Sequence, residues 1–170
     1  MKSICVAILA IMAAAGAAAQ TPNDAQIAAI VVTANQVDID AGKLAEKQGH
    51  ARDVKAFGKQ MVTDHTGVNK QAVALVKKLN VTPEENPTSE SLRAGGKENM
   101  TTLKGLTGTS FDKAYIDHEV AYHEQVIDAI DKTLIPSAQN GELKSLLVAV
   151  RPAFVGHLEH AKMIQSSLGK

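Results

Sequence analysis

The sequence is poor in the residues on which many binding and catalytic sites depend. Its 170 residues include one cysteine, no tryptophan, two tyrosines and three phenylalanines. So few aromatic side chains argue against a stacking platform for nucleic-acid bases or sugars. The only cysteine, Cys5, lies in an N-terminal segment that we expect to be removed. Disulfides, thiolate metal ligands and cysteine nucleophiles are therefore excluded from the mature chain.

The sequence also lacks an excess of charge of either sign. It contains 18 lysine and arginine residues and 18 aspartate and glutamate residues, which are interspersed along the chain. Proteins that hold nucleic acids or anionic membranes by electrostatics carry clustered positive charge. We therefore expect no nucleic-acid partner and no anionic-membrane anchor, and the sequence does not indicate any protein partner.

Long apolar runs are absent except at the N-terminus, which reads MKSICVAILAIMAAAGAAAQ. A basic Lys2, an apolar run over residues 4–15 and small residues at 17–19 are typical of a secretory signal peptide. We expect cleavage after Ala19, delivery to the periplasm or secretion, and a single domain over residues 20–170. The apolar run is shorter than the roughly 20 residues that span a bilayer, so we expect no membrane span in the mature chain.

Sequence signatures of common enzymes are absent as well. No serine-centred nucleophile elbow, glycine-rich phosphate loop or His-Glu-x-x-His zinc sequence occurs. The Glu-x-x-His sequence that di-iron bundles carry twice is also missing. These absences favour a function without catalysis. An enzyme remains a hypothesis, and it would need an open coordination position with a substrate channel.

What the chain does contain is a series of helix-forming segments, with apolar residues spaced three and four apart. Asn23 or Asp24 is expected to cap the first helix, and residues 80–90, with two prolines, are expected to form a loop. A short helix follows that loop, interrupted by Gly95 and Gly96. The sequence thus predicts four long helices over about 24–48, 51–79, 110–134 and 142–168, and a short one over 89–104.

Two local features mark the last two long helices. Thr109 and Asp112 fit a capping box in which each side chain accepts a hydrogen bond from the other's backbone N–H. The segment IPSAQNG is expected to end that helix, and Pro152 is expected to bend the last one.

The order of these helices predicts the architecture. A connection of about 30 residues separates the second long helix from the third. Such a connection is typical of an all-α, ferritin-like four-helix bundle whose long crossover carries a short extra helix. An all-antiparallel bundle with a subsidiary excursion is the alternative.

One polar residue lies in the middle of the apolar stripe of each long helix: Asp38, His65, His123 and His157. With 3.6 residues per turn, each falls where its stripe is deepest. Each also lies within about three residues of its helix midpoint, a few Å at ~1.5 Å per residue. The four side chains are therefore expected to meet in one buried layer, where an unpaired carboxylate would be costly.

Four other residues are weaker candidates for the same layer. Glu119 stands one turn before His123, so both side chains can lie on one face. Asp64 and His160 fall at the edges of their stripes. Asp64 fits a hydrogen-bond partner of a ligand, a ligand itself, or a solvated side chain, which is the commonest outcome. Met61 stands one turn before His65 and fits either a copper ligand or ordinary packing.

Two interpretations of the layer follow from its chemistry. Three imidazoles and a carboxylate supply the nitrogen and oxygen ligands that zinc, copper or iron accept without cysteine. A hydrogen-bond network between aspartate and histidine, with no metal, explains the same pattern.

Four blocks of the sequence carry a family resemblance: NQVDIDAGKLA, VKAFGKQMVTDHTGVNKQ, LTGTSFDKAYIDHEVAYHEQV and AFVGHLEHAKMI. Together they resemble the bacterial exported family called domain of unknown function 4142 (DUF4142). The resemblance implies a ferritin-like helical bundle and export, with no established activity. The family carries a glutamate four residues before the glycine of the first helix, where this chain has Asp38 before Gly42.

The sequence therefore leads to two hypotheses besides an enzyme. In the first, the protein is a periplasmic bundle that binds one transition-metal ion for storage, sensing or buffering. In the second, it is a non-catalytic envelope stress or structural protein, whose polar layer only fixes the register of the helices. The metal ligands in the first hypothesis are Asp38, His65, His123 and His157, supported by Glu119, Asp64 or His160.

Overall fold

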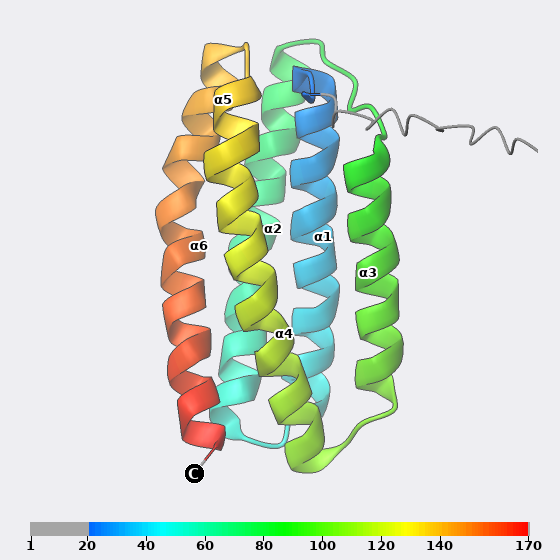
Figure 1. Cartoon of the computed structure of the whole chain (residues 1–170), viewed down its shortest axis with the longest axis vertical. Helices are drawn as coiled ribbons and strands as arrows, with labels where there is room; N and C mark the ends of the chain where they lie inside the picture. Colours follow the sequence, from blue (N-terminus) through cyan, green and yellow to red (C-terminus); the bar gives the residue numbers. More distant parts are fainter. Residues whose placement is uncertain (1–20, 170) are drawn as a thin grey trace, which may run out of the picture.

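The computed structural model describes residues 21–169, and the expected signal peptide with Cys5 lies outside them. Within that range the chain is all-α and contains no strand, which confirms the predicted fold class. Figure 1 shows the elements: α1 (Asp24–Gln48), α2 (Arg52–Lys78), α3 (Pro87–Lys104), α4 (Gly108–Ala129), η1 (Ile130–Leu134), α5 (Ile135–Ser137) and α6 (Gly141–Leu168).

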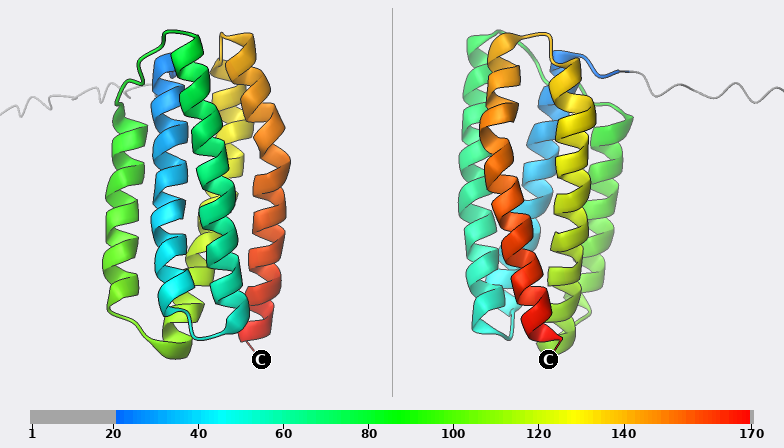
Figure 2. Two further views of the ribbon diagram at one scale, coloured as in Figure 1. Left: turned by 180° about the vertical axis from the view of Figure 1, so that it is seen from behind. Right: turned by 60° about the vertical axis from the view of Figure 1, so that its left-hand side comes forward.

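The long helices α1, α2, α4 and α6 lie side by side, and α3 lies against the outer side of α1 (Figures 1 and 2). Each of the four is antiparallel to its neighbours, with α1 and α2 forming the most extensive contact. Helix α3 carries the chain back along the length of the molecule, so α2 and α4 run in the same direction (Figure 2). This arrangement is compatible with the predicted four-helix bundle and its crossover.

No helix within residues 21–169 has the length and the apolar character that crossing a membrane requires.

Helix α3 is longer than the sequence indicates, because a cap lies inside the segment predicted as a loop. The side chain of Asn86 accepts hydrogen bonds from the backbone N–H groups of Thr88 and Ser89. Pro87 occupies the first turn, where a missing N–H has no cost. The predicted loop over residues 80–90 is therefore wrong in its last four residues, which belong to α3.

The paired glycines of α3 do not interrupt it. A Cβ atom at Gly96 would lie 2.7 Å from a methyl carbon of Val37, which is closer than side chains pack. Glycine at this position lets α3 lie directly against α1. Because α3 covers its outer side, α1 is buried on more faces than the single stripe that the sequence predicts.

A second close approach joins α1 to α2. A Cβ on Gly42 would lie 2.8 Å from the carbonyl oxygen of Gly58, and a Cβ on Gly58 would lie 2.7 Å from that of Gly42. The two backbones therefore touch, as only glycine permits. Gly42 lies one turn after Asp38 and Gly58 lies two turns before His65, so this contact sets the relative height of these two side chains.

Aspartates from distant parts of the chain cap two of the helices. The predicted capping box at Thr109 and Asp112 is wrong, because α4 has no side-chain cap. Asp112 instead accepts hydrogen bonds from the backbone N–H groups of His50 and Ala51, at 2.8 and 2.7 Å, where α2 begins.

The other cross-chain cap lies at the opposite end of the molecule. Asp24 accepts hydrogen bonds from the backbone N–H groups of Gln139 and Asn140, both at 2.9 Å, immediately before α6. The sequence does predict the cap of α1, where the side chain of Asn23 accepts a hydrogen bond from the N–H of Gln26.

The third long helix extends beyond its predicted end. After α4 the chain makes the wider π-helical turn η1, in which the N–H of Ile135 bonds to the carbonyl of Ile130. Pro136 follows in α5, where its missing N–H is tolerated. Helix α6 then continues through Pro152 without a break.

The apolar core forms two clusters. One contains Phe57, Phe111 and Tyr115, and the other contains Ile27 and Phe154 among its buried residues. Along each long helix, the polar residue of the predicted layer stands between members of the two clusters. The layer thus divides the core into two apolar halves.

Candidate metal centre in the bundle core

The four long helices bring the predicted polar residues together. Helix α1 supplies Asp38, α2 supplies His65, α4 supplies Glu119 and His123, and α6 supplies His157. Each of these side chains is at most 4% exposed. The prediction that these side chains meet in one layer holds, because the four long helices place them at the same height in the bundle.

Two overlapping groups of side chains have ligand atoms close enough to share an ion. Atoms of His65, His123 and His157 lie within 4.8 Å of one another, and so do atoms of Asp38, Glu119 and His123. The Nε2 atom of His65 lies 3.2 Å from Oδ2 of Asp38, and Nε2 of His123 lies 3.8 Å from the same oxygen. Asp38 therefore faces two of the imidazoles.

The outer ring nitrogen of His65, Nδ1, has a hydrogen-bond partner that determines which nitrogen of the ring carries the proton. The Nδ1 atom lies 2.7 Å from Oδ1 of Asn35, and the amide nitrogen of Asn35 donates to the carbonyl of Val31 at 2.8 Å. Because the Asn35 amide is oriented by this second bond, its oxygen accepts from His65. The proton of the neutral imidazole is then on Nδ1, and Nε2 carries a free lone pair.

The other two imidazoles are oriented in the same manner. The Nδ1 atom of His123 donates to the backbone carbonyl of Glu119 at 3.0 Å. The Nε2 atom of His157 donates to Oδ2 of Asp64 at 2.9 Å. Carbonyl and carboxylate partners of this kind are what metal-bound histidines use to fix their tautomer and to raise ligand basicity.

The atoms that face the interior are left without partners. Within residues 21–169, no hydrogen bond reaches Nε2 of His65, Nε2 of His123 or Nδ1 of His157, and the carboxyl groups of Asp38 and Glu119 interact with each other. A buried polar group without a hydrogen-bond partner lowers the free energy of unfolding by about 1–3 kcal/mol, and by more if it is charged. The three inward imidazole nitrogens are therefore available as ligands for a cation.

Burial determines the protonation of the layer. It lowers the pKa of His65 to about 2 and that of His123 to about 4, so both imidazoles are neutral at pH 7. It raises the pKa of Asp38 to about 7. Burial and then the charge of Asp38 raise the pKa of Glu119 well above its ordinary value. A cation in the layer would favour the ionised form of both carboxyl groups, and the neutral imidazoles could bind it without losing a proton.

Three of the weaker candidates lie outside the layer. The Nδ1 atom of His160 donates to Oε1 of Gln60 at 3.1 Å, and the ring centroid of His160 lies 5.2 Å from that of Phe57. Met61 is fully buried in the apolar cluster that contains Phe57. Asp64 is 41% exposed and contacts the layer through His157 rather than from within it.

The sequence interpretation missed Asn35 and Phe154. The ring centroid of Phe154 lies 5.0 Å from that of His65 and 6.0 Å from that of His123, forming an apolar wall. The neighbouring Ala153 is exposed. Phe154 stands three residues before His157, a helical spacing that could have identified it.

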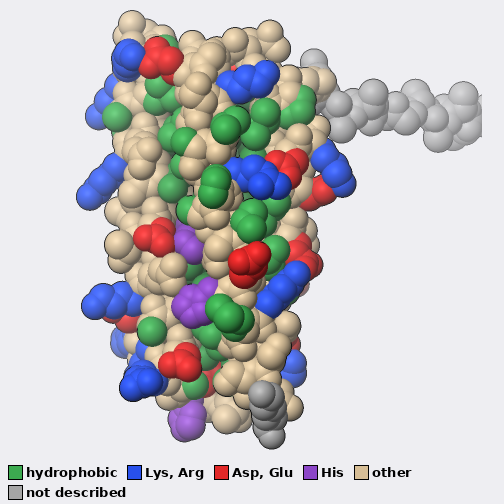
Figure 3. Space-filling model, turned by 90° about the vertical axis from the view of Figure 1, so that its left-hand side faces the viewer, with side chains coloured by type: hydrophobic (Ala, Val, Ile, Leu, Met, Phe, Trp, Pro, Cys, Tyr) green, Lys and Arg blue, Asp and Glu red, His purple; other side chains and the backbone are tan. Residues whose placement is uncertain are grey.

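A groove connects the layer to the surface between α2 and α6. It has a volume of about 380 Å³, and Asp64, His65 and His157 lie along it. Gly67 and Ala153 are among the small residues that keep it open. On the side of the bundle shown in Figure 3, histidine side chains are visible at mid-height between hydrophobic ones.

Comparison with known proteins identifies the family. The family model described as domain of unknown function DUF4142 matches residues 10–164 of the chain. The chain belongs to the DUF4142 family. The resemblance stated from the sequence is thereby confirmed, whereas no curated protein and no solved structure matches. The candidate centre of this DUF4142 protein therefore has to be interpreted from its own geometry.

Proposed function

We propose that this DUF4142 protein is exported to the periplasm and binds one transition-metal ion in its core for storage, sensing or buffering. One observation carries the proposal. Each of the three buried imidazoles uses its outer nitrogen in a hydrogen bond, while its inner nitrogen has no hydrogen-bond partner within residues 21–169. Asp38 adds a carboxyl group whose Oδ2 lies 3.2 Å from Nε2 of His65.

The same observation favours a metal over a purely structural network. In a purely structural network, the carboxylates would accept hydrogen bonds from the histidine ring nitrogens that face the centre of the layer. Here Oδ2 of Asp38 and Nε2 of His65 are 3.2 Å apart, and yet the proton of His65 is engaged with Asn35 on the other side of the ring. When Asp38 is ionised, the two lone pairs that face each other repel, whereas a cation between them attracts both.

The ligand set restricts the class of ion. Imidazole and carboxylate ligands without thiolate fit Zn²⁺, Fe²⁺ and Cu²⁺. In a tetrahedral zinc site, bonds of ~2.0–2.1 Å place the ligand atoms roughly 3.3 Å apart. The ligand atoms of His65, His123 and His157 lie within 4.8 Å of one another. Side-chain rotations that move these atoms by about 1 Å bring them to the spacing of a zinc site. Asp38 is the fourth ligand, and Glu119 is positioned to balance charge.

Elemental analysis of the untagged protein, extracted from the periplasm without chelator, tests the proposal. We expect a near-stoichiometric metal content in the wild type and its loss in the double variant His65→Ala, His123→Ala. The matched control is His118→Ala, His160→Ala, which removes two histidines outside the layer and should retain the metal. The N-terminal sequence of the extracted protein should begin at Gln20.

Two results would contradict the proposal. Metal absent from all three proteins would leave the layer as a structural network. Metal present equally in all three would place the ion elsewhere. In either case the imidazoles of the layer only hold the helices in register, and function should be sought at the surface.

A further inference from the structure

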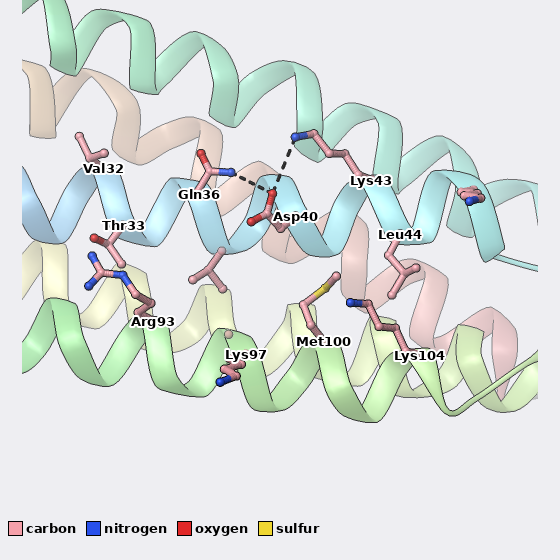
Figure 4. A pocket seen from close by; sticks show the side chains of 13 residues that line it. Val32, Thr33, Gln36, Asp40, Lys43, Leu44, Arg93, Lys97, Met100 and Lys104 are labelled. Carbon is pink, nitrogen blue, oxygen red and sulfur yellow. Dashed lines mark hydrogen bonds and ion pairs between the residues drawn. The ribbon is translucent and has the colours of Figure 1, made fainter.

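A groove outside the four-helix core lies between α1 and α3. Its volume is about 720 Å³, and its floor includes the apolar side chains of Val37, Leu44 and Met100. Figure 4 shows Met100 reaching from α3 toward α1, beside Leu44. Along α1 the lining runs from residue 32 to residue 47, which is ~22 Å at 1.5 Å per residue. The space is therefore long and narrow.

The rim of this groove concentrates positive charge. Five lysine and arginine side chains and one aspartate line it, although the whole chain has a formal net charge of +0. Arg93 is paired with Glu85, and Lys43 lies 3.7 Å from Asp40. By contrast, no ion pair within residues 21–169 involves the other lining cations, which are Lys47, Lys97 and Lys104.

The charge is distributed unevenly along the groove. Helices α1 and α3 run in the same direction (Figure 1), and Lys47 and Lys104 each lie in the last turn of their helix. Both lysines are therefore at one end. From that end the apolar floor extends past Leu44 and Met100 toward Val37 and Val32. The groove thus has two lysines at one end and an apolar floor along its length, with Lys97 on the rim between its ends.

We propose that this groove binds a single-chain anionic amphiphile, of the class of medium-chain fatty acids, with its carboxylate between Lys47 and Lys104. The alkyl chain then lies on the floor formed by Leu44, Met100 and Val37. A compact ring system does not match the elongated space, and a polyanion would need more cations than this rim has. The proposal does not depend on a metal in the core.

Calorimetric titration of the mature protein with dodecanoate, below its micellar concentration, tests the inference. We expect saturable binding of one molecule, with affinity that falls as salt rises because the contact is ionic. Lys47→Gln, Lys104→Gln should weaken binding at least tenfold. The matched control Lys77→Gln, Lys144→Gln removes two lysines outside this groove and should change affinity less than twofold.

A floor variant and two other ligands complete the test. Met100→Asp should weaken dodecanoate at least tenfold, and circular dichroism should show an unchanged helix content. Dodecanol, which lacks the charge, should bind the wild type and the Lys47→Gln, Lys104→Gln variant equally. The inference is overturned if dodecanoate binding does not saturate, or if the two double lysine variants lower the affinity equally. It is also overturned if a short glutamate-rich peptide binds more tightly than dodecanoate.

Discussion

At the scale of single residues, the outer hydrogen bond of each imidazole determines what its inner nitrogen can do. Asn35 shows this most directly, because its oxygen accepts from His65 and its own orientation is fixed by Val31. The partner of a metal-bound histidine typically contributes 10–100-fold to metal affinity, that is, about 1.4–2.7 kcal/mol.

Asn35→Leu should therefore weaken metal binding roughly 10–100-fold, since leucine has a similar volume and no acceptor. Competition with a chromogenic chelator measures the affinity. Asn35→Asp, which keeps an acceptor oxygen, is the control and should bind metal within a fewfold of the wild type. Equal loss in both variants would show that Asn35 acts by packing and not by orienting His65.

The buried carboxylate makes the metal-free protein sensitive to pH in a defined direction. The pKa of Asp38 is about 7 in the folded protein and about 4 when unfolded, so its contribution to stability is fully present below pH 4 and is lost as pH rises to 7. His65 and His123 act oppositely. Their folded pKa values are about 2 and 4, so their contribution is lost as pH falls below about 6.5.

Asp38→Asn should therefore raise the Tm of the chelator-treated protein more at pH 8 than at pH 5, by roughly 5 °C or more. Differential scanning calorimetry at the two pH values gives the comparison. The difference between the two pH values is the quantity of interest, because any general effect of the amide is common to both. No difference would mean that Asp38 is already compensated in the metal-free protein.

At this scale the sequence predicts much of the site. Asp38, His65, His123 and His157 are found because a polar residue inside an apolar stripe breaks the helical period. Asn35 could not be found in this way, since its role depends on the partner presented by α2. Asp112 was assigned to the wrong cap for a similar reason, because the N–H groups that it accepts from lie 61 and 62 residues away.

At the scale of helices, the contact between Gly42 and Gly58 holds α1 and α2 in the register that brings Asp38 and His65 together. An added methyl group at Gly58 would lie 2.7 Å from a carbonyl oxygen of α1, whereas one at Gly67 would meet nothing within 4 Å. Both glycines are inside α2, so replacing either by alanine gains about 1 kcal/mol of helix propensity.

The two substitutions should have opposite effects on stability. Gly58→Ala is expected to destabilise the fold by about 1–3 kcal/mol through overpacking, and to weaken metal binding by shifting His65 relative to Asp38. Gly67→Ala is expected to stabilise it by up to about 1 kcal/mol. Urea unfolding followed by circular dichroism measures both. A stabilising Gly58→Ala would mean that the two helices can separate at no cost.

The groove between α2 and α6 should be the path by which ions reach His157 and His65. Gly67→Phe fills this groove, and we expect it to slow metal uptake about tenfold in stopped-flow mixing while leaving the final metal content unchanged. Gly95→Phe is the matched control, because a side chain at Gly95 also meets nothing within 4 Å. Equal uptake rates in the two variants would require another path.

Helix ends are where the sequence was least informative. The π-helical turn at Ile130 follows no simple repeat, so the continuation of the helix past Leu134 was not predictable from periodicity. Helix α3 was underestimated because it has little apolar character of its own. Its partner is α1, and the fit depends on Gly96 having no side chain.

At the scale of the whole molecule, the polar layer separates two apolar clusters, so an ion at its centre would tie all four long helices together. Ligand bound only to the folded state stabilises it by RT ln(1 + [L]/Kd), or about 2.7 kcal/mol at a hundredfold excess over Kd. For a chain of this size, that raises the Tm by about 5–10 °C.

Addition of Zn²⁺ to the chelator-treated wild type should produce this shift, measured by scanning calorimetry. The double variant His65→Ala, His123→Ala should show no shift. A similar rise in both proteins would indicate adventitious surface binding, and a rise in neither would exclude zinc as the ion.

The two aspartate caps described above also bear on how the molecule folds. Asp112 completes the start of α2, and Asp24 completes the start of α6, across 61 and 116 residues of chain respectively. A nascent pair of α1 and α2 therefore lacks the carboxylate that finishes its own turn until α4 has been synthesised and docked. Contacts between such distant residues slow folding and make it more cooperative, so the two ends of the bundle should close last and together.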